Sequence, residues 1–250
     1  MKKKNFNLFL LLVLIQFGFV SPVFAVVIQG SFEGSIVSSA DYSGYFGTAG
    51  SGLQNGNTIT GQFTYDTDLA PGDIESDPTA GLYQDFGGND WLQMSMTISG
   101  HTFDFLGSDP QVVNIYDQLT SSTGYDGFET STQETSITTS GSSTSYIGSS
   151  SGIIIFSYIN DFILGEGLEQ DFTWTSSVGD YDSWGFYNVW DYTYDSNTDN
   201  TTYNGDTISG GFNISSITAS TVGVSVPEPT SIALLGLGLI GLGFARRSQV

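Results

Sequence analysis

Apolar residues and glycine alternate with polar residues along three segments of the chain, at residues 26–36, 58–65 and 92–98. Successive side chains of a strand point to opposite faces of a sheet, so a period of two predicts strands that bury one face and expose the other. No stretch of residues 26–225 shows a helical period of useful length. The pattern therefore predicts an all-β body.

Shorter segments have strand character as well, and clusters of glycine, asparagine, aspartate and serine separate them in the manner of turns. These segments are residues 102–106, 111–116, 153–159, 172–176 and 206–218. Short strands at this spacing predict an antiparallel β-sandwich of the jelly-roll type. We interpret four glycines as turn residues: Gly30, Gly61, Gly100 and Gly210.

Residues 120–151 consist mainly of serine, threonine and glycine. Such a composition fits either a mobile loop or a pair of exposed hairpin strands, and both interpretations stay open. The apolar run at residues 153–156 follows directly. Because an exposed run of this kind is an aggregation hazard, we expect it in the middle of the sheet.

The charge of the chain is strongly acidic and unevenly placed. The 250 residues carry a net charge of -21, and all five Lys and Arg residues lie at the two ends. A body without a basic footprint is not a nucleic-acid binder. Its carboxylates must be solvated, hydrogen-bonded or neutralised by a metal or another external cation. The absence of cysteine excludes thiolate zinc sites, cysteine nucleophiles and disulfides.

The first 25 residues have the three parts of a secretory signal peptide. A basic segment at residues 2–4 precedes an apolar stretch at residues 6–20, and a helix-breaking Ser21-Pro22 leads to Ala25. This order predicts a helical leader that signal peptidase removes after Ala25. The alternative is an uncleaved N-terminal membrane anchor.

The C-terminus combines a Pro-Glu-Pro motif, a short apolar segment and a basic pair. Pro227-Glu228-Pro229 cannot join a helix or a central strand. Residues 232–245 predict a hydrophobic helix of about 21 Å, which is shorter than a hydrocarbon core of about 30 Å. We therefore expect a tilted or transient membrane insertion, with Arg246 and Arg247 on the cytoplasmic side.

These three parts, in this order, resemble the PEP-CTERM sorting signal of Gram-negative bacteria. The resemblance implies cleavage near the motif by an exosortase, a membrane transpeptidase, and delivery to the cell surface or the polysaccharide matrix of a biofilm. Before cleavage the protein would be tethered to the membrane. A C-terminal anchor that is never cut is the alternative. The chain then divides into a signal peptide (residues 1–25), a β-sandwich ectodomain (26–225) and a sorting segment (226–250).

Two acidic segments are candidate calcium sites. Asp195, Asn197, Asp199 and Asp206 occupy positions 1, 3, 5 and 12 of the calcium-loop template, although Asn200 replaces its glycine. The alternative is a solvated turn between strands. The second acidic segment, for which a soluble loop is again the alternative, consists of Asp66, Asp68, Asp73, Glu75 and Asp77.

An aromatic row occupies one parity of the segment 184–194. Its members are Trp184, Phe186, Trp190, Tyr192 and Tyr194. Flat rings on one strand face can stack on sugar rings, so Trp184, Trp190 and Tyr192 are candidate glycan-binding residues. Aromatic rows of this period also form ordinary sandwich cores, and this alternative stays open.

We predict a non-catalytic protein. His101, the only histidine, lies in an expected tight turn, and the body contains no Lys or Arg to stabilise an oxyanion. The prediction is an exported, exosortase-processed surface or matrix protein with a structural or adhesive role in contact with polysaccharide. The alternatives are a calcium-dependent carbohydrate-binding module and a secreted glycan-cleaving enzyme of the paired-carboxylate type.

Overall fold

The computed structural model describes residues 26–223 apart from 54, 75–78, 87–88, 108, 119–123 and 178–181. The predicted signal peptide, its cleavage position at Ala25 and the sorting segment from residue 226 lie outside the described residues. Among the residues described, there is no helix long and apolar enough to cross a membrane.

The described residues form twelve strands. They are β1 (Val26–Asp41), β2 (Thr58–Asp66), β3 (Ala80–Asp85), β4 (Leu92–Ile98), β5 (His101–Phe105), β6 (Gln111–Asp117), β7 (Asp126–Ser140), β8 (Ser143–Ser157), β9 (Phe172–Thr175), β10 (Asp182–Asp195), β11 (Asn200–Tyr203) and β12 (Ile208–Gly223).

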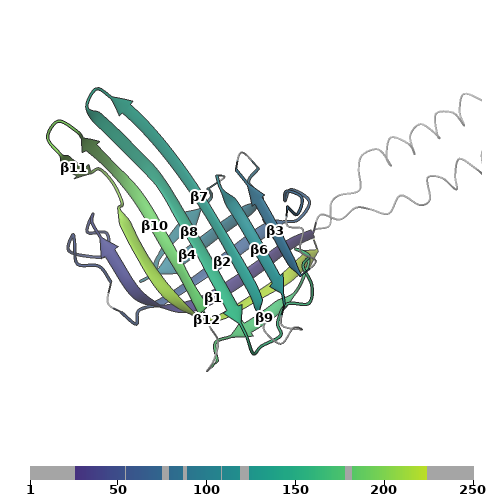
Figure 1. Cartoon of the computed structure of the whole chain (residues 1–250). Coiled ribbons are helices and arrows are strands. Elements are labelled where there is room, and N and C mark those ends of the chain that lie inside the picture. The colour runs from purple at the N-terminus through teal and green to yellow at the C-terminus, as the bar shows by residue number, and fades with distance from the viewer. Residues whose placement is uncertain are drawn as a thin grey trace, which may run out of the picture. The chain divides into compact units, whose positions relative to one another are not determined.

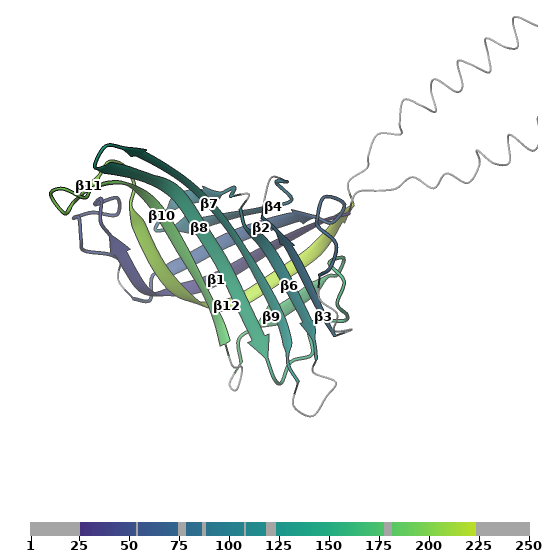
Figure 2. The ribbon, with the colours of Figure 1, turned by 45° about the horizontal axis from the view of Figure 1, so that its top comes forward.

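One antiparallel sheet contains all of these strands, in the order β3-β6-β7-β8-β10-β12-β1-β2-β4-β5, with β11 paired to β10 and β9 to β12. The sheet curls, so that β4 and β5 contact β7 and β5 also contacts β8. Figures 1 and 2 both show β1 and β2 crossing behind β7 and β8. The predicted all-β, sandwich-like fold is confirmed, and its two layers are two halves of one sheet.

The core lies between these two halves and follows the alternation of the sequence. Every second residue is buried from Ile28 to Ile36 of β1 and along β2 and β4. The apolar run at residues 153–156 lies on β8, between β7 and β10, and Ile153 and Ile155 are fully buried. The expected central position of this run is confirmed.

Several mid-strand glycines make room for aromatic rings of the neighbouring strand. Gly30 of β1 pairs with Phe63 of β2, and Phe32 of β1 pairs with Gly61 of β2. A Cβ atom at either glycine would overlap the ring of its partner. Phe63 and Phe32 therefore lie flat against glycine backbone inside the core, where both are buried.

The prediction that four glycines are turn residues is thus largely wrong. Gly210 lies within β12, opposite Tyr187 of β10, in the same kind of pair as Gly30 and Gly61. Only Gly100 is a turn residue: it follows Ser99 between β4 and β5, and both have positive φ. The absence of a Cβ atom at Gly30, Gly61 and Gly210 serves packing in the strands, because each glycine leaves room for the aromatic ring directly opposite it.

The Ser/Thr-rich segment forms a hairpin, as the second interpretation predicted, but only the outer half of the hairpin is exposed. Its strands β7 and β8 pair from Asp126↔Ser157 to Ser140↔Ser143, with Gly141 in the turn. Outside this hairpin, the short strands β3 and β11 lack an alternating pattern, and the sequence did not predict them.

Buried carboxylates are satisfied by backbone N–H groups, since the described residues contain no Lys or Arg. Asp41, fully buried at the end of β1, accepts hydrogen bonds from Gly44 N and Tyr45 N at 2.8 Å and from Phe46 N at 2.7 Å. Asp126 accepts two comparable bonds from the loop after β8. Hydrogen bonding is thus how this acidic chain tolerates carboxylates in its interior.

Candidate functional site

The aromatic row of β10 lies on the face of the sheet that points away from the core. The intervening residue Tyr187 is fully buried, whereas Trp184 is 41% exposed and the other rings of the row are half-buried. The row is therefore not sandwich core. We call this surface the aromatic face; it comprises Trp184, Phe186, Trp190, Tyr192 and Tyr194 of β10, Tyr146 of β8 and Tyr203 of β11.

Glycines of β8 hold two of these rings flat. Phe186 pairs with Gly152, and Trp190 pairs with Gly148. A Cβ atom on either glycine would come within 2.7 Å of the ring of its partner. Each ring therefore lies against the backbone of β8 on one side, and its other side points away from the sheet. This arrangement makes a flat aromatic surface.

Tyrosines extend the aromatic face across the strands. Tyr146 stacks on Tyr192 with ring centroids 4.9 Å apart and an interplanar angle of 22°. Tyr192 meets Tyr203 edge-on at 6.4 Å, and Tyr203 stacks on Tyr42 at 5.5 Å. Stacked rings hold one another in fixed positions, so this ladder is preorganised for a flat ligand.

Part of the aromatic face lies on an arm that extends past the neighbouring strands. Pairing of β7 with β6 ends at Gln111↔Thr132, and pairing of β10 with β12 ends at Val189↔Ile208. The arm comprises residues 133–149 and 189–203, which form β11 and the outer ends of β7, β8 and β10. It projects at the upper left of Figure 1.

The arm lies at the pole opposite to the two ends of the body. β1 and β12 are antiparallel neighbours. The hydroxyls of Ser31 and Thr218 share a hydrogen bond and the Ser215 hydroxyl donates to Glu33 O, so Val26 and Val222 lie at the same end of the sheet. Followed along the strands at about 3.3 Å per residue, the path from Val222 to the tip of the arm is about 65 Å.

The arm carries four carboxylates and no basic side chain: Glu134, Asp191, Asp195 and Asp199. The hydroxyl of Tyr194 donates to Asp199 Oδ1 at 3.0 Å, and this hydrogen bond raises the pKa of Tyr194. Asn197 N donates to Asp195 Oδ1 at 2.9 Å and lowers the pKa of that carboxyl. Asp195 is therefore ionised at neutral pH, and as the residue after Tyr194 in β10 it points to the opposite face of the sheet from the rings.

The structure does not bring the four residues of the first calcium prediction together. Asp195 and Asp199 flank a hairpin turn, since Asp195 pairs with Asn200. Strand β11 then runs back along β10, and Asp206 follows only after Gly205, whose N–H donates to Asp191 O. Among residues 26–223 with their gaps, no three His, Asp or Glu side chains are grouped closely enough to hold a metal ion.

The second acidic segment is only partly described. Asp66 Oδ1 accepts a hydrogen bond from Asp68 N at 3.0 Å, and Asp73 Oδ1 accepts one from Leu82 N at 2.9 Å. These bonds order the loop between β2 and β3. Glu75 and Asp77 lie outside the described residues.

His101 is exposed at the first position of β5. It follows the two-residue turn of Ser99 and Gly100. The rings of Tyr45 and Phe46 pack edge-on against its imidazole, with centroid distances of 4.9 and 5.8 Å. The surroundings of this histidine are thus an aromatic cluster at the end of the sheet.

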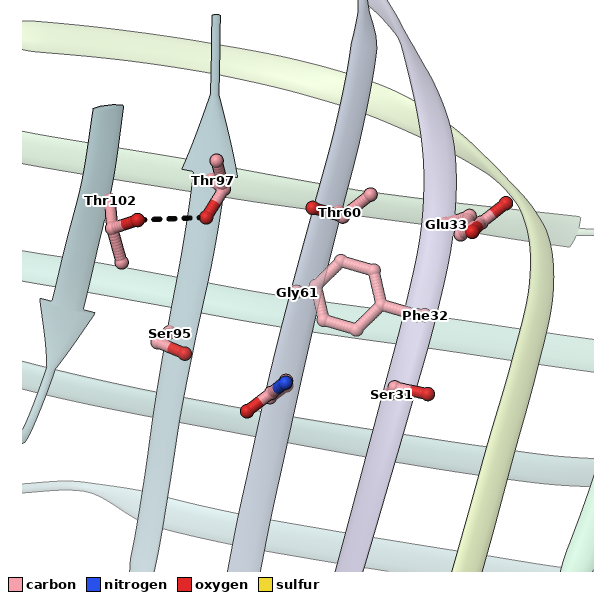
Figure 3. Close-up of a pocket in the computed structure, with 9 residues that line it drawn as sticks. Ser31, Phe32, Glu33, Thr60, Gly61, Ser95, Thr97 and Thr102 are labelled. Atoms are coloured by element: carbon pink, nitrogen blue, oxygen red, sulfur yellow. Dashed lines mark hydrogen bonds between the residues drawn. The ribbon is translucent and has the colours of Figure 1, made fainter. Parts of the chain in front are cut away.

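A second surface differs in character from the aromatic face. We call it the hydroxyl face; it comprises Ser31 and Glu33 of β1, Thr60 and Gln62 of β2, Ser95 and Thr97 of β4 and Thr102 of β5. Figure 3 shows these side chains around an open depression of about 380 Å³, with a hydrogen bond of 2.9 Å between Thr97 and Thr102. Their parity follows from the sequence, but their assembly depends on strand order, which the sequence did not provide.

Comparison with known proteins adds one finding. The PEP-CTERM protein-sorting motif matches residues 225–247. No curated protein and no solved structure matches the chain. The fold and the motif define an exported all-β protein of the cell surface or extracellular space. More specifically, its tail carries the sorting signal of an exosortase substrate, and Pro227, Glu228, Pro229, Arg246 and Arg247 all lie within the matched segment.

Proposed function

We propose that the body is a non-catalytic component of the cell surface or extracellular matrix that contacts polysaccharide through its aromatic face. The observation that carries the proposal is the placement of Trp184, Trp190 and Tyr192 on the outer side of the sheet. Large rings on an outer face lose the free energy of burial unless a partner covers them, so such surfaces mark binding sites.

A polysaccharide suits this surface for geometric reasons. Side chains two residues apart on a strand are about 7 Å apart, so the row from Trp184 to Tyr194 spans about 34 Å. Pyranose rings present C–H groups on their faces, which pack on aromatic rings, while tyrosine hydroxyls remain free to hydrogen-bond at the edges. An extended chain of sugars can therefore lie along β10.

The position of the arm supports a role in adhesion. The sorting tail continues from the end of β12, and the arm lies at the opposite pole of the body. Exosortase processing acts on the tail and leaves the aromatic face unchanged. A protein attached through its C-terminus would thus hold much of its aromatic surface away from the attachment point.

The test is affinity electrophoresis of the exported protein through gels that contain the host's own matrix polysaccharide. We expect retardation, and a loss of apparent affinity of about tenfold or more in a Trp184→Ala/Trp190→Ala variant, at about 1 kcal/mol for each ring–sugar contact. Phe86→Ala is the matched control, because Phe86 is 64% exposed and lies outside the aromatic face.

The melting temperature separates a binding role of the two tryptophans from a structural one. Because neither side chain belongs to the buried core, the double variant should unfold close to the parent protein. Equal retardation of the parent and the double variant contradicts the proposal. Release of reducing sugar from the polysaccharide would contradict its non-catalytic part.

A further inference from the structure

We propose that the aromatic face binds an uncharged polysaccharide, and that the row of side chains through Asn188 hydrogen-bonds its sugars between two ring platforms. This inference rests on the proposed function and specifies the chemical class of the ligand. It follows from the side chains that share the outer side of the sheet with the rings.

The outward positions beside the rings are uncharged in the part of the chain that the structure describes. Successive residues of a strand point to opposite sides, so the register defines which neighbours share the side of the rings from Phe186 to Tyr194. On β8, β11 and β12 these neighbours are serine, threonine, tyrosine and glycine, and on β7 they are Ser131, Gln133, Thr135, Ile137 and Thr139. We call these rows, from Phe186 to Tyr194, the uncharged strip.

The acidic residues in the strands of the arm have the opposite parity. Glu134 lies between outward residues of β7, and Asp191 and Asp195 alternate with the rings of β10. Their side chains therefore point to the other side of the sheet. In a body as acidic as this one, the strands of the arm thus keep their charges away from the rings.

Two carboxylates mark the ends of the uncharged strip. At one end, Glu129 lies in the row of Trp184 and accepts a hydrogen bond from Asn114 Nδ2 at 2.9 Å. At the other end, Asp199 accepts the hydrogen bond of the Tyr194 hydroxyl at 3.0 Å. Each of these carboxylates has a donor within the protein, and the strip between them offers rings, amides and hydroxyls to a ligand.

A polar row crosses the strip between two ring platforms. Asn188 lies between Phe186 and Trp190 on β10, with Ser150 of β8 and Ser209 of β12 on its two sides. Asn188 Nδ2 donates to Ser150 Oγ at 3.2 Å. An asparagine amide has two N–H donors and a carbonyl oxygen, so one N–H and the oxygen of Asn188 remain for a ligand.

An uncharged sugar chain uses all of these groups. Phe186 and Trp190 are about 13 Å apart along the strand, so sugars can stack on both rings while a sugar between them lies over Asn188. A uronate, sulfate or phosphate group would meet repulsion from the acidic body, and residues 26–222 contain no Lys or Arg to pair with it. An ammonium group buried on the strip would lie on the side away from Asp191 and Asp195, and burial of an unpaired charge is costly.

The experiment separates the host's matrix polysaccharide by ion exchange into neutral, acidic and basic fractions and measures binding of the full exported protein to each by affinity electrophoresis. We expect the neutral fraction to bind at least about tenfold more tightly than either charged fraction. Reduction of the carboxyl groups of the acidic fraction converts its uronates into neutral sugars with the same linkages, so the reduced fraction should bind more tightly than the untreated one. Binding of the neutral fraction should change by less than about twofold with salt concentration, since no charge pair is screened.

Two amide variants test the polar row. Asn188→Ala removes the half-buried amide between the ring platforms, and the control Gln62→Ala removes an outward amide of the hydroxyl face. We expect the first variant to bind the neutral fraction about fivefold more weakly, as for the loss of one or two hydrogen bonds, and the control to bind as the parent does. Both variants should melt close to the parent protein, because neither side chain belongs to the core.

Each contrary outcome is distinct. Equal or tighter binding of a charged fraction, lost in Trp184→Ala/Trp190→Ala, overturns the preference for uncharged sugars and leaves the proposed function standing. Binding of the neutral fraction that depends on the tryptophans but not on Asn188 overturns the assignment of the polar row. Absence of binding to every fraction, the carboxyl-reduced one included, overturns both proposals.

Discussion

The two outer faces of this sheet differ although both are exposed to water. On the hydroxyl face, the register aligns three threonines (Thr60, Thr97 and Thr102) with Glu33 in one row of polar side chains. On the aromatic face, the corresponding outward positions of β10 carry large rings. Ordinary sandwich strands follow the first pattern, so the second requires an explanation beyond folding.

Pairs of a glycine with an aromatic ring occur both in the core and on the aromatic face, so the same substitution can be compared at the two places. Inside the core, Gly30 accommodates Phe63; on the aromatic face, Gly152 accommodates Phe186. A Cβ atom would come within 2.0 Å of the Phe63 ring at Gly30 and within 2.7 Å of the Phe186 ring at Gly152. Phe63 is also enclosed by other core residues, whereas Phe186 is only half-buried. The same substitution should therefore have different consequences at the two sites.

The largest expected effect is the difference between Gly30→Ala and Gly152→Ala. At Gly30 the new methyl group overlaps a ring that cannot move, and we expect a loss of about 3 kcal/mol in the free energy of unfolding, as for an overpacked core. At Gly152 the ring of Phe186 can turn into the solvent, and the loss should be about 1 kcal/mol or less. Urea denaturation of both variants measures the difference; equal losses would show that Phe186 is as confined as Phe63.

The second prediction concerns Tyr187, the tyrosine of β10 whose side chain is buried in the core. Burial raises the pKa of Tyr187 to about 12, above the value of about 10 in an unfolded chain. Below pH 10 the phenol is protonated in both states and stability is unaffected. Between pH 10 and 12 the unfolded state releases the proton and the native state retains it, so stability falls, by at most about 1.4 kcal/mol per pH unit before solvent screening.

Tyr187→Phe tests this prediction, because phenylalanine cannot ionise. The variant should lose less stability than the parent between pH 10 and 12 in urea titrations at fixed pH. Burial also raises the pKa of Tyr65, which the variant retains, so part of the alkaline loss should persist. The body has no lysine to titrate in this range. Identical pH profiles of the parent and Tyr187→Phe would contradict the inward, buried placement of this ring.

The sequence predicted the strands better than the relation between them. Alternation located β1, β2 and β4, because their buried faces are apolar and their outer faces polar. Along β10 the aromatic row is opposed by Tyr187 and Val189, so the pattern showed that Trp184 and Trp190 share a face but not which face is buried. Which face of β10 is buried depends on its pairing with β8 and β12, and the local sequence does not encode that pairing.

The glycines were misinterpreted, and the calcium-like spacing of residues 195–206 stayed ambiguous, for a related reason. Gly30 and Gly61 resemble turn residues until the register places each opposite a phenylalanine. The spacing of Asp195 and Asp206 resembles a calcium loop only if the chain between them is one turn; instead β11 occupies it. In both cases a contact between strands, invisible in the local sequence, determines the role of the residue.

The smallest expected effect concerns the hydroxyl face. Thr60→Val and Thr97→Val each remove a hydroxyl group from a half-buried position. The second change also breaks the cross-strand hydrogen bond of Thr97 with Thr102. Valine keeps the β-branched shape that suits a strand. We expect a change within about 0.5 kcal/mol in the free energy of unfolding. Retardation by the matrix polysaccharide should equal that of the parent, because sugars are proposed to contact the opposite layer. A loss of binding in the threonine variants, with binding retained in Trp184→Ala/Trp190→Ala, would transfer the glycan contact from the aromatic face to the depression between β1 and β5.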